Sequence, residues 1–222
     1  MNNATACGQD LVIGSLEMPR PAIRVAIAYH SLQGHVAKLA RAVADGVGDV
    51  PDAVAHPVLL DALTGASWET IDRADAIVFG CPTYMGGASA VFKTFAEQSL
   101  RQWLDNLRWR HKVAAGFTHS QALSGDKLHT LQYLTILAAQ HGMLWVTLDA
   151  YAGSPSETTE LNRLGAWLGV ISQSDRDAPV DEAPPASDLA TARHLGRRVA
   201  QVTRDLLVGR HVLRLIDERS RS

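Results

Sequence analysis

Residues 23–47 read IRVAIAYHSLQGHVAKLARAVADGV, and the fold prediction starts from the pattern of these residues. Its first seven residues, 23–29, are apolar with several β-branched side chains, a pattern typical of a buried strand. The polar segment 30–34 contains a glycine and predicts a turn. Beyond the turn, apolar side chains recur at helical spacing at Val36, Leu39, Ala40, Val43 and Val47. The stretch is therefore a strand–loop–helix unit.

The same unit repeats along the chain. Further strands are expected at 54–60, 75–80, 112–117 and 143–148. A short helix or turn is expected at 67–73, and helices are expected at 88–100, 128–141 and 187–207, with a long loop over 151–186. The strand at 54–60 is expected near a sheet edge, because Pro57 lacks a backbone donor. Five strands that alternate with helices predict an α/β fold with a parallel sheet covered on both faces.

Composition and charge exclude several classes of protein. The 222 residues carry a formal net charge of −2 and show no basic stripe, so nucleic acid is not an expected partner. Cys7 and Cys81 are too few for a disulfide framework and indicate a reducing compartment. We find neither a signal peptide nor an apolar run of ~20 residues, so a cytoplasmic protein without a membrane span is expected. The expected plan is a leader (1–21), one domain (22–207) and a tail (208–222).

Three polar loops follow the first, third and fourth expected strands, at 30–36, 81–87 and 118–126. In parallel α/β sheets, ligands bind outside the carboxyl ends of the strands, so these loops predict a ligand site. Ser31 and Gly34 precede a helix N-terminus, which suits either an anionic phosphate or an ordinary helix cap. Tyr84 and Met85 either cover a planar ring or pack on the surface.

The sequence motifs of several other kinds of site are absent. GxGxxG is absent after the first strand, and GxxxxGK[ST] is absent throughout, so neither a dinucleotide-binding Rossmann loop nor ATP hydrolysis is supported. GxSxG is absent, which disfavours a serine hydrolase. Nine histidines occur without HExxH or a cysteine pair, and no metal is predicted.

Four segments together carry a family resemblance: AYHSLQGHVAKLARAVADG (28–46), FGCPTYMGGASAVFKTFAEQS (79–99), GFTHS (116–120) and AAQHGM (138–143). They resemble the flavodoxin-like NAD(P)H:quinone oxidoreductases of the WrbA type, within the NADPH-dependent FMN reductase group. The resemblance implies a flavodoxin-like three-layer sandwich with a five-stranded parallel sheet in order 2-1-3-4-5. It also implies FMN as cofactor, NAD(P)H as electron donor, quinone-like acceptors, and a homodimer or homotetramer.

The resemblance further implies roles for individual residues. The FMN phosphate is expected on Ser31, Gln33, Gly34, His35 and Val36. The isoalloxazine ring is expected along Pro82, Thr83, Tyr84, Met85, Gly86 and Gly87, with the ribityl chain and ring edge beside Thr118, His119 and Ser120. His141 is expected to contact the flavin as the catalytic residue, and Trp103 and Tyr84 to border the acceptor pocket.

The family pattern changes at the donor and acceptor positions. Gln33 stands where an aromatic residue is common, Tyr84-Met85 replace an Arg-Phe pair, and Gln121-Ala122-Leu123 replace a glycine-rich run. These changes predict a different donor or acceptor preference. The implied reaction passes a hydride from NAD(P)H through the flavin to the acceptor by ping-pong kinetics. The alternatives are a flavodoxin-type electron carrier without NAD(P)H activity and a flavodoxin-fold binding module that lacks FMN.

Overall fold

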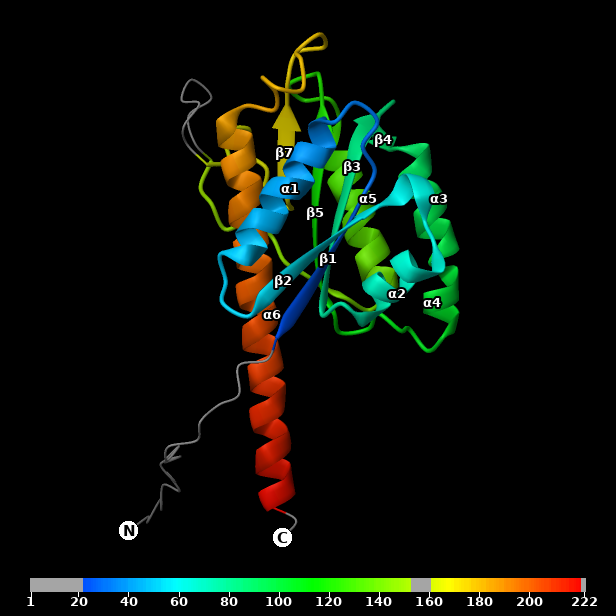
Figure 1. Ribbon diagram of the computed structural model, residues 1–222, viewed down its shortest axis with the longest axis vertical. Coiled ribbons are helices and arrows are strands. Elements are labelled where there is room, and N and C mark those ends of the chain that lie inside the picture. Colours follow the sequence, from blue (N-terminus) through cyan, green and yellow to red (C-terminus); the bar gives the residue numbers. More distant parts are fainter. Residues whose placement is uncertain (1–21, 153–160, 221–222) are drawn as a thin grey trace, which may run out of the picture.

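A computed structural model describes residues 22–152 and 161–220 of the chain (Figure 1). The expected leader, 1–21, lies outside the described residues. The strands are β1 (Ile23–Tyr29), β2 (Ala53–Leu59), β3 (Ala76–Tyr84), β4 (Gly87–Ala88), β5 (Val113–Ser120), β6 (Leu144–Trp145) and β7 (Val170–Gln173). The helices are α1 (His35–Gly48), the 3-10 turn η1 (Leu60–Ala62), α2 (Gly65–Arg73), α3 (Ala90–Gln98), α4 (Leu100–Leu104), α5 (Lys127–Gln140) and α6 (Ala186–Arg219).

The sheet has the strand order β2-β1-β3-β5-β6, with parallel pairing along this path. This confirms the flavodoxin-like α/β fold and the order 2-1-3-4-5. The strand β2 lies at the end of the path, and Pro57 stands opposite Ile27 in its pairing with β1. A proline is tolerated there because an edge strand needs fewer backbone donors.

The described sheet has seven strands, so the expected number of five was too low. β4 is a two-residue strand that pairs antiparallel with the end of β3. The fifth position of the sheet is shared by two segments: β6 pairs with Val113 and Ala114, whereas β7 pairs with β5 from Phe117 to Ser120. The segment 151–186 was expected to be a loop, yet it contains β7, because four residues within a polar, Gly- and Pro-rich stretch give a weak periodic signal.

Two hydrophobic cores lie on the two faces of the sheet, because alternate strand residues point to opposite sides. In β1, Val25 and Ile27 belong to the core under α1 and α6, whereas Ala26 and Ala28 belong to the core under α2, α3 and α5. Figure 1 shows α1 and α6 on one side of the sheet and α2 to α5 on the other. The three expected layers are therefore present.

The helices α1 and α6 approach closely through two glycines. A Cβ atom at Gly46 would lie 1.8 Å from the carbonyl oxygen of Arg193, and one at Gly196 would lie 2.0 Å from the carbonyl oxygen of Val43. Real side chains do not approach backbone atoms so closely. The absence of a side chain at these two positions lets the backbones meet and fixes the N-terminal half of α6 against α1.

The final helix is longer than expected. We expected it to end near Leu207, but α6 continues to Arg219 and projects beyond the body of the molecule (Figure 1). The extension contains Gly209 but no proline, and Val208, Val212 and Leu215 continue the helical spacing. None of the helices in the described part of the chain is long and apolar enough to cross a membrane.

Candidate functional site

A cavity of about 610 Å³ opens at the carboxyl ends of β1, β3 and β5. This volume lies within the range of ~300–1,000 Å³ that is usual for small-molecule sites. The three expected loops do meet there, through Ser31, Leu32, Gln33, His35 and Val36 of the first, Pro82, Thr83, Tyr84, Met85 and Gly86 of the second, and His119, Ser120, Gln121, Ala122 and Gly125 of the third. A fourth segment, Ser174 to Arg176, completes the lining.

The first loop ends in the N-terminus of α1. The backbone N–H of Ala37 donates to Ser31 Oγ at 3.0 Å, so Ser31 does serve as a local cap. Gly34 adopts φ 91°, a conformation that favours glycine, and directs the chain into the helix. His35 is 7% exposed, and its buried Nε2 has no hydrogen-bond partner among the described residues. The free N–H groups and positive dipole end of a helix N-terminus favour an anion at this position.

The second loop is a tight hairpin. β3 extends to Tyr84, the chain turns through Met85 (φ 47°) and Gly86 (φ 81°), and β4 returns antiparallel to β3. Tyr84 and Met85 are exposed at the mouth of the cavity. His129 Nδ1 lies 2.6 Å from the carbonyl oxygen of Gly86 and fixes the hairpin against α5.

Buried hydroxyl groups join the second and third loops beneath the cavity. Thr83 Oγ1 lies 2.8 Å from Thr118 Oγ1 and 2.7 Å from Thr130 Oγ1, and Thr118 Oγ1 donates to the carbonyl oxygen of Cys81 at 2.7 Å. Thr118 is fully buried, and of the expected site residues in the three loops, Gly34, Gly87 and Thr118 are not among those that line the cavity. This network sets the relative position of β3 and β5 at the site.

Two histidines meet at the cavity. The ring centroids of His35 and His119 are 4.9 Å apart. His119 Nδ1 lies 3.2 Å from Ser172 Oγ, and its Nε2 lies 3.2 Å from Ser174 Oγ. Burial, with the nearby charges of His35 and Lys127, lowers the pKa of His119 to about 4. His119 is consequently neutral near pH 7 and acts as a hydrogen-bonding group rather than a cation.

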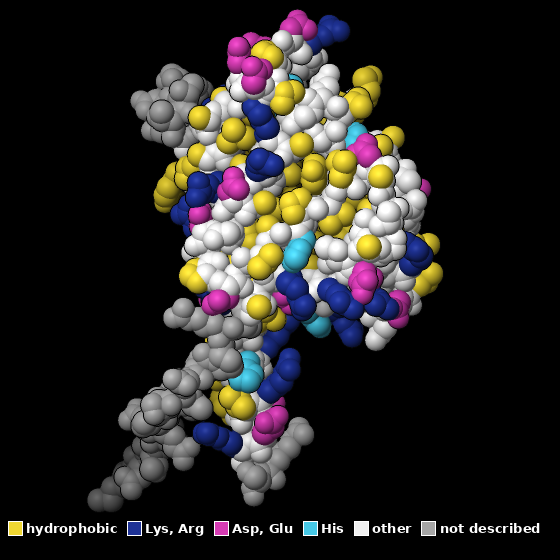
Figure 2. Space-filling model, in the orientation of Figure 1, with side chains coloured by type: hydrophobic (Ala, Val, Ile, Leu, Met, Phe, Trp, Pro, Cys, Tyr) yellow, Lys and Arg dark blue, Asp and Glu magenta, His cyan; other side chains and the backbone are white. Residues whose placement is uncertain are grey.

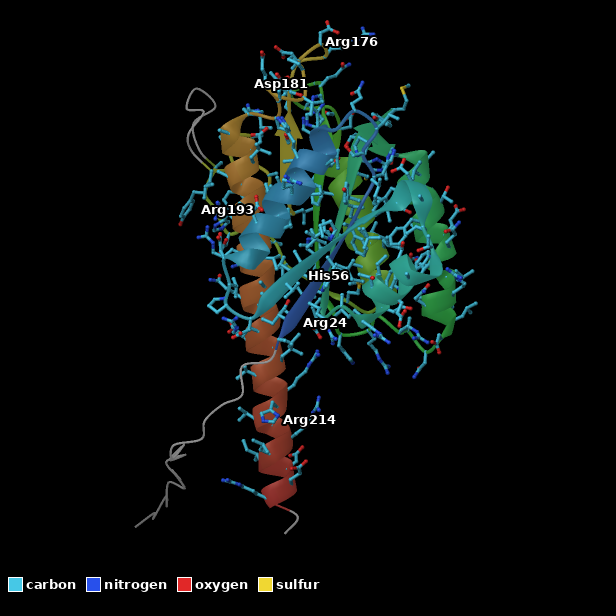
Figure 3. All side chains as sticks on the ribbon, viewed as in Figure 1. Arg24, His56, Arg176, Asp181, Arg193 and Arg214 are labelled. Atoms are coloured by element: carbon cyan, nitrogen blue, oxygen red, sulfur yellow. The ribbon has the colours of Figure 1, made fainter. Side chains whose placement is uncertain are left out.

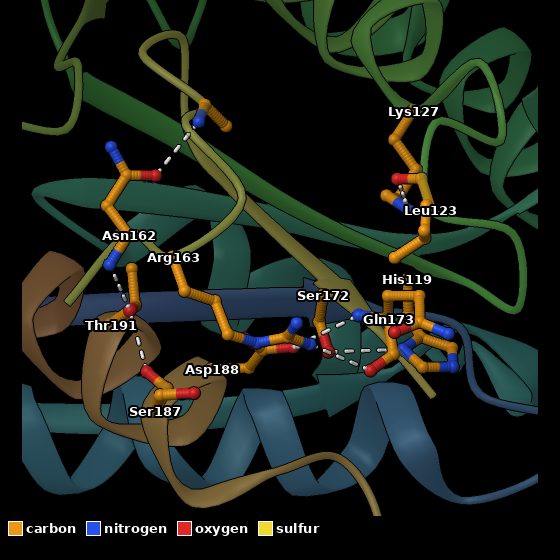
Figure 4. Close-up of polar contacts among 11 residues, drawn as sticks. His119, Leu123, Lys127, Asn162, Arg163, Ser172, Gln173, Ser187, Asp188 and Thr191 are labelled. Carbon is orange, nitrogen blue, oxygen red and sulfur yellow. Dashed lines mark hydrogen bonds and ion pairs between the residues drawn. The ribbon is translucent and has the colours of Figure 1, made fainter. Parts of the chain in front are cut away.

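A buried lysine shapes the third loop. Lys127 is fully buried, and its Nζ donates to Ser120 Oγ at 3.1 Å, the Ala122 carbonyl at 2.6 Å and the Leu123 carbonyl at 2.9 Å. Figure 4 shows the contact with Leu123. Burial lowers the pKa of Lys127 to about 8. These three hydrogen bonds hold the third loop against the ammonium group of Lys127. The role of Lys127 was not predicted, because a lysine that begins a helix gives no sequence signal for burial.

The fourth lining segment was also missed by the sequence reasoning, since it lies within the expected loop 151–186. It is held at its base by an ion pair between Arg163 and Asp188, whose side chains are 11% and 2% exposed (Figure 4). Asp188 accepts from Arg163 Nε at 2.7 Å and from the N–H of Gln173 at 3.0 Å, and Arg163 Nη2 donates to the carbonyl of Gln173 at 3.2 Å. The backbone N–H and carbonyl of Gln173, the last residue of β7, are thus both hydrogen-bonded to this ion pair.

His141 and Trp103 lie away from this cavity within one chain. They line a second cavity of about 660 Å³ between α3, α4 and α5. His141 Nε2 lies 2.9 Å from Ser99 Oγ, and its ring lies 4.4 Å from that of Trp109; burial lowers its pKa to about 4. The separation arises because α5 runs from the carboxyl end of the sheet to the amino end, so its first and last residues lie at opposite ends.

Two other kinds of chemistry find little support. Ser89, His30 and Asp61 are arranged as in a hydrolase, with His30 Nδ1 2.7 Å from Ser89 Oγ and His30 Nε2 3.6 Å from Asp61 Oδ1. Ser89 is only 1% exposed, however, so its hydroxyl cannot reach a substrate. Within residues 22–152 and 161–220, no three His, Cys, Asp or Glu side chains are grouped to hold a metal ion.

Comparisons with known proteins converge on one family. A family model described as NADPH-dependent FMN reductase matches residues 30–156, more than half of the chain. Flavodoxin FldP of Pseudomonas aeruginosa is 37% identical over 188 residues, covering 82% of this chain and 98% of the relative. An NAD(P)H dehydrogenase (quinone) of Archaeoglobus fulgidus is 31% identical over 204 residues, with 82% and 98% covered. The crystal structure of a flavodoxin, WrbA-like protein from Agrobacterium tumefaciens superposes with TM-score 0.65 at 40% identity, covering 82% of this chain and 98% of that one.

Proposed function

The chain belongs to the NADPH-dependent FMN reductase family, and we propose that it passes electrons from NAD(P)H through FMN in the described cavity to quinone-like acceptors. It is an NAD(P)H-dependent flavin oxidoreductase with FMN as its cofactor. We infer quinones as the acceptor class because two relatives are named NAD(P)H dehydrogenase (quinone). We also propose that the kinetics are ping-pong and that residues of the cavity contact FMN, the nicotinamide nucleotide and the quinone.

The observation that carries this proposal is the buried, unpartnered Nε2 of His35 at the N-terminus of α1. A buried polar atom without a partner is costly, and an anionic ligand at this position would supply one. Ser31, the N–H groups of the first helical turn and His35 together suit the phosphate of FMN. The volume and the mixed polar and apolar lining of the cavity fit a ligand of the size of FMN. The residues present therefore fit this cofactor.

The remaining lining residues would position the ring and admit the substrates. The hairpin from Pro82 to Gly86 would flank one side of the ring, and the segment from His119 to Ala122 the other. Bound FMN supplies two-electron chemistry, in which it accepts a hydride from a nicotinamide and reduces a quinone. Tyr84 and Met85, exposed at the mouth, would contact whichever planar substrate enters.

Initial-rate kinetics test this proposal. With NADPH and a soluble benzoquinone varied together, one shared opening predicts parallel double-reciprocal lines. We expect Tyr84→Ala to raise the KM for the quinone about tenfold, because a planar contact of ~1–1.5 kcal/mol is removed. The matched control is Tyr151→Ala, since Tyr151 is 91% exposed and lies outside the cavity lining. Intersecting double-reciprocal lines, together with equal KM values for the quinone in Tyr84→Ala and Tyr151→Ala, would contradict a shared opening.

A second candidate function is an electron carrier without NAD(P)H activity. The name of the P. aeruginosa relative, flavodoxin, favours it. The exposed apolar side chains Leu32, Tyr84 and Met85 around the mouth would also suit a protein partner. The two candidates differ in a single property, since only the reductase is reduced directly by a nicotinamide nucleotide.

We further propose that copies of the chain associate through the second cavity, which would bring His141 and Trp103 toward the flavin of another copy. Leu100 and Ile136, which line this cavity, are 54% and 59% exposed, and Leu104 at the end of α4 is 69% exposed. The buried Nδ1 of His141 has no hydrogen-bond partner among the described residues. Sedimentation equilibrium is expected to give a dimer or tetramer that Leu104→Glu dissociates. His141→Ala is expected to shift the midpoint potential of bound FMN in the assembly. A monomeric wild type with an unchanged potential in the variant would reject this role.

A further inference from the structure

The loop that follows β7 contributes an arginine to the mouth of the cavity. We propose that Arg176 recognises a phosphomonoester, either the 5′-phosphate of FMN or the 2′-phosphate of NADPH. This inference rests on the proposed function, because both phosphates belong to molecules that the cavity would take. Arg176 was not among the residues that the sequence identified.

The position of this loop supports the inference. Ser174, Asp175 and Arg176 line the same cavity as Ser31 to Val36, the segment at the N-terminus of α1. Farther along the loop, the methyl carbons of Val180 lie 3.1 Å from the point where a Cβ at Gly34 would stand. The loop therefore packs on the anion-binding segment. Figure 1 shows both at the same end of the molecule, beyond the carboxyl ends of the strands.

The base of the loop is firmly anchored. His119 Nε2 lies 3.2 Å from Ser174 Oγ, and the side chain of Gln173 donates to the carbonyl of Gln121 at 2.9 Å. The buried pair of Arg163 and Asp188 fixes the residue just before the loop. Arg176 is thus only two residues beyond a held position, which limits the entropy lost when its side chain engages a ligand.

The guanidinium group of Arg176 is available to a ligand, although the exposed carboxylates of Asp175 and Asp177 are its neighbours in the chain. Arg176 is exposed and forms no hydrogen bond or ion pair with any described residue. By contrast, Arg193 pairs with Asp49 and Arg198 with Asp149 on the surface of α6. The adjacent carboxylate of Asp175 instead accepts from Gln173 Nε2 at 3.4 Å. Figure 2 shows acidic and basic side chains gathered at this end of the molecule.

The chemistry of the guanidinium group suits a phosphate. Its planar fork donates two parallel hydrogen bonds to phosphate oxygens, and its charge adds to the positive dipole end of α1. A phosphomonoester carries nearly two negative charges at neutral pH, so an unpaired cation beside the helix N-terminus favours it. Because Arg176 is exposed, solvent screening limits the gain.

The test compares ligands that differ only by a phosphate. FMN and riboflavin are titrated by flavin fluorescence quenching, and KM is measured for NADPH and NADH, with Arg176→Gln, Arg176→Lys and Arg214→Gln. Arg214 is the matched control because it is an exposed arginine at the far end of α6 (Figure 3). We expect Arg176→Gln to weaken FMN binding about tenfold and riboflavin binding little, with Arg176→Lys intermediate.

The two ligand pairs distinguish the 5′-phosphate of FMN from the 2′-phosphate of NADPH. An increase in the KM of NADPH but not of NADH, with unchanged FMN binding, would assign Arg176 to the donor and still support phosphate recognition. The proposal would be overturned if Arg176→Gln weakened the binding of FMN and riboflavin equally. It would also be overturned if neither the affinity ratio of FMN to riboflavin nor the KM ratio of NADPH to NADH changed. If the wild type binds neither flavin, the proposed function fails with it, whereas a failure confined to Arg176→Gln leaves that function standing.

Discussion

Replacing Gly196 by alanine is expected to lower the free energy of unfolding by about 3 kcal/mol. The new Cβ would lie 2.0 Å from the carbonyl oxygen and 2.8 Å from the carbonyl carbon of Val43, both in the backbone of α1. A backbone cannot rotate away as a side chain can, so α1 and α6 must separate and loosen the core between them. Urea unfolding followed by circular dichroism measures the loss.

Gly209→Ala in the same helix is the matched control for this prediction. A Cβ at Gly209 would meet no atom of residues 22–152 or 161–220 within 4 Å. Alanine is a better helix former than glycine, so this variant is expected to gain ~0.5–1 kcal/mol. If the two variants have equal stability, the close approach of α1 and α6 does not constrain the fold as we describe.

Replacing Asp188 by alanine is expected to cost about 3–5 kcal/mol, because it leaves the guanidinium of Arg163 buried without a counter-charge. It also removes the acceptor for the N–H of Gln173 at the end of β7. The loop from Ser174 to Arg176 would then lose its anchor, and FMN binding should weaken as well. Urea unfolding and fluorescence titration with FMN measure the two effects.

Two controls separate burial from charge in this prediction. Asp49→Ala breaks the pair with Arg193 on the surface, where side-chain exposures are 26% and 53%, and is expected to cost far less. The double variant Arg163→Met, Asp188→Leu removes both charges and should recover much of the stability. An Asp188→Ala variant as stable as Asp49→Ala would show that this pair does not hold β7.

The sequence predicted the parts of the fold that depend on local pattern. The expected strand at 23–29 coincides with β1, and the three expected loops converge on the cavity. These features follow from apolar periodicity and from the position of parallel strand ends. β7 was missed because its four residues, 170–173, gain their strand character from pairing with Phe117 to Ser120, far away in the chain.

The missed parts of the site depend on contacts between distant segments. Lys127 matters because the loop before it folds back over its side chain, and Arg176 because β7 delivers it beside α1. His141 and Trp103 were expected at the flavin, yet in one chain the direction of α5 carries them to another cavity. Residue type identified these side chains, but only the packing of the helices locates them.

FMN binding and reduction by a nicotinamide are tested together by an absorption spectrum of the purified protein, incubated with FMN, desalted, and then mixed with NADPH or NADH without oxygen. We expect a flavin spectrum that is retained after desalting and bleaches on addition of nucleotide. Retained flavin that does not bleach would move the assignment to an electron carrier. A colourless protein after desalting would show that the cavity at the N-terminus of α1 is not an FMN site.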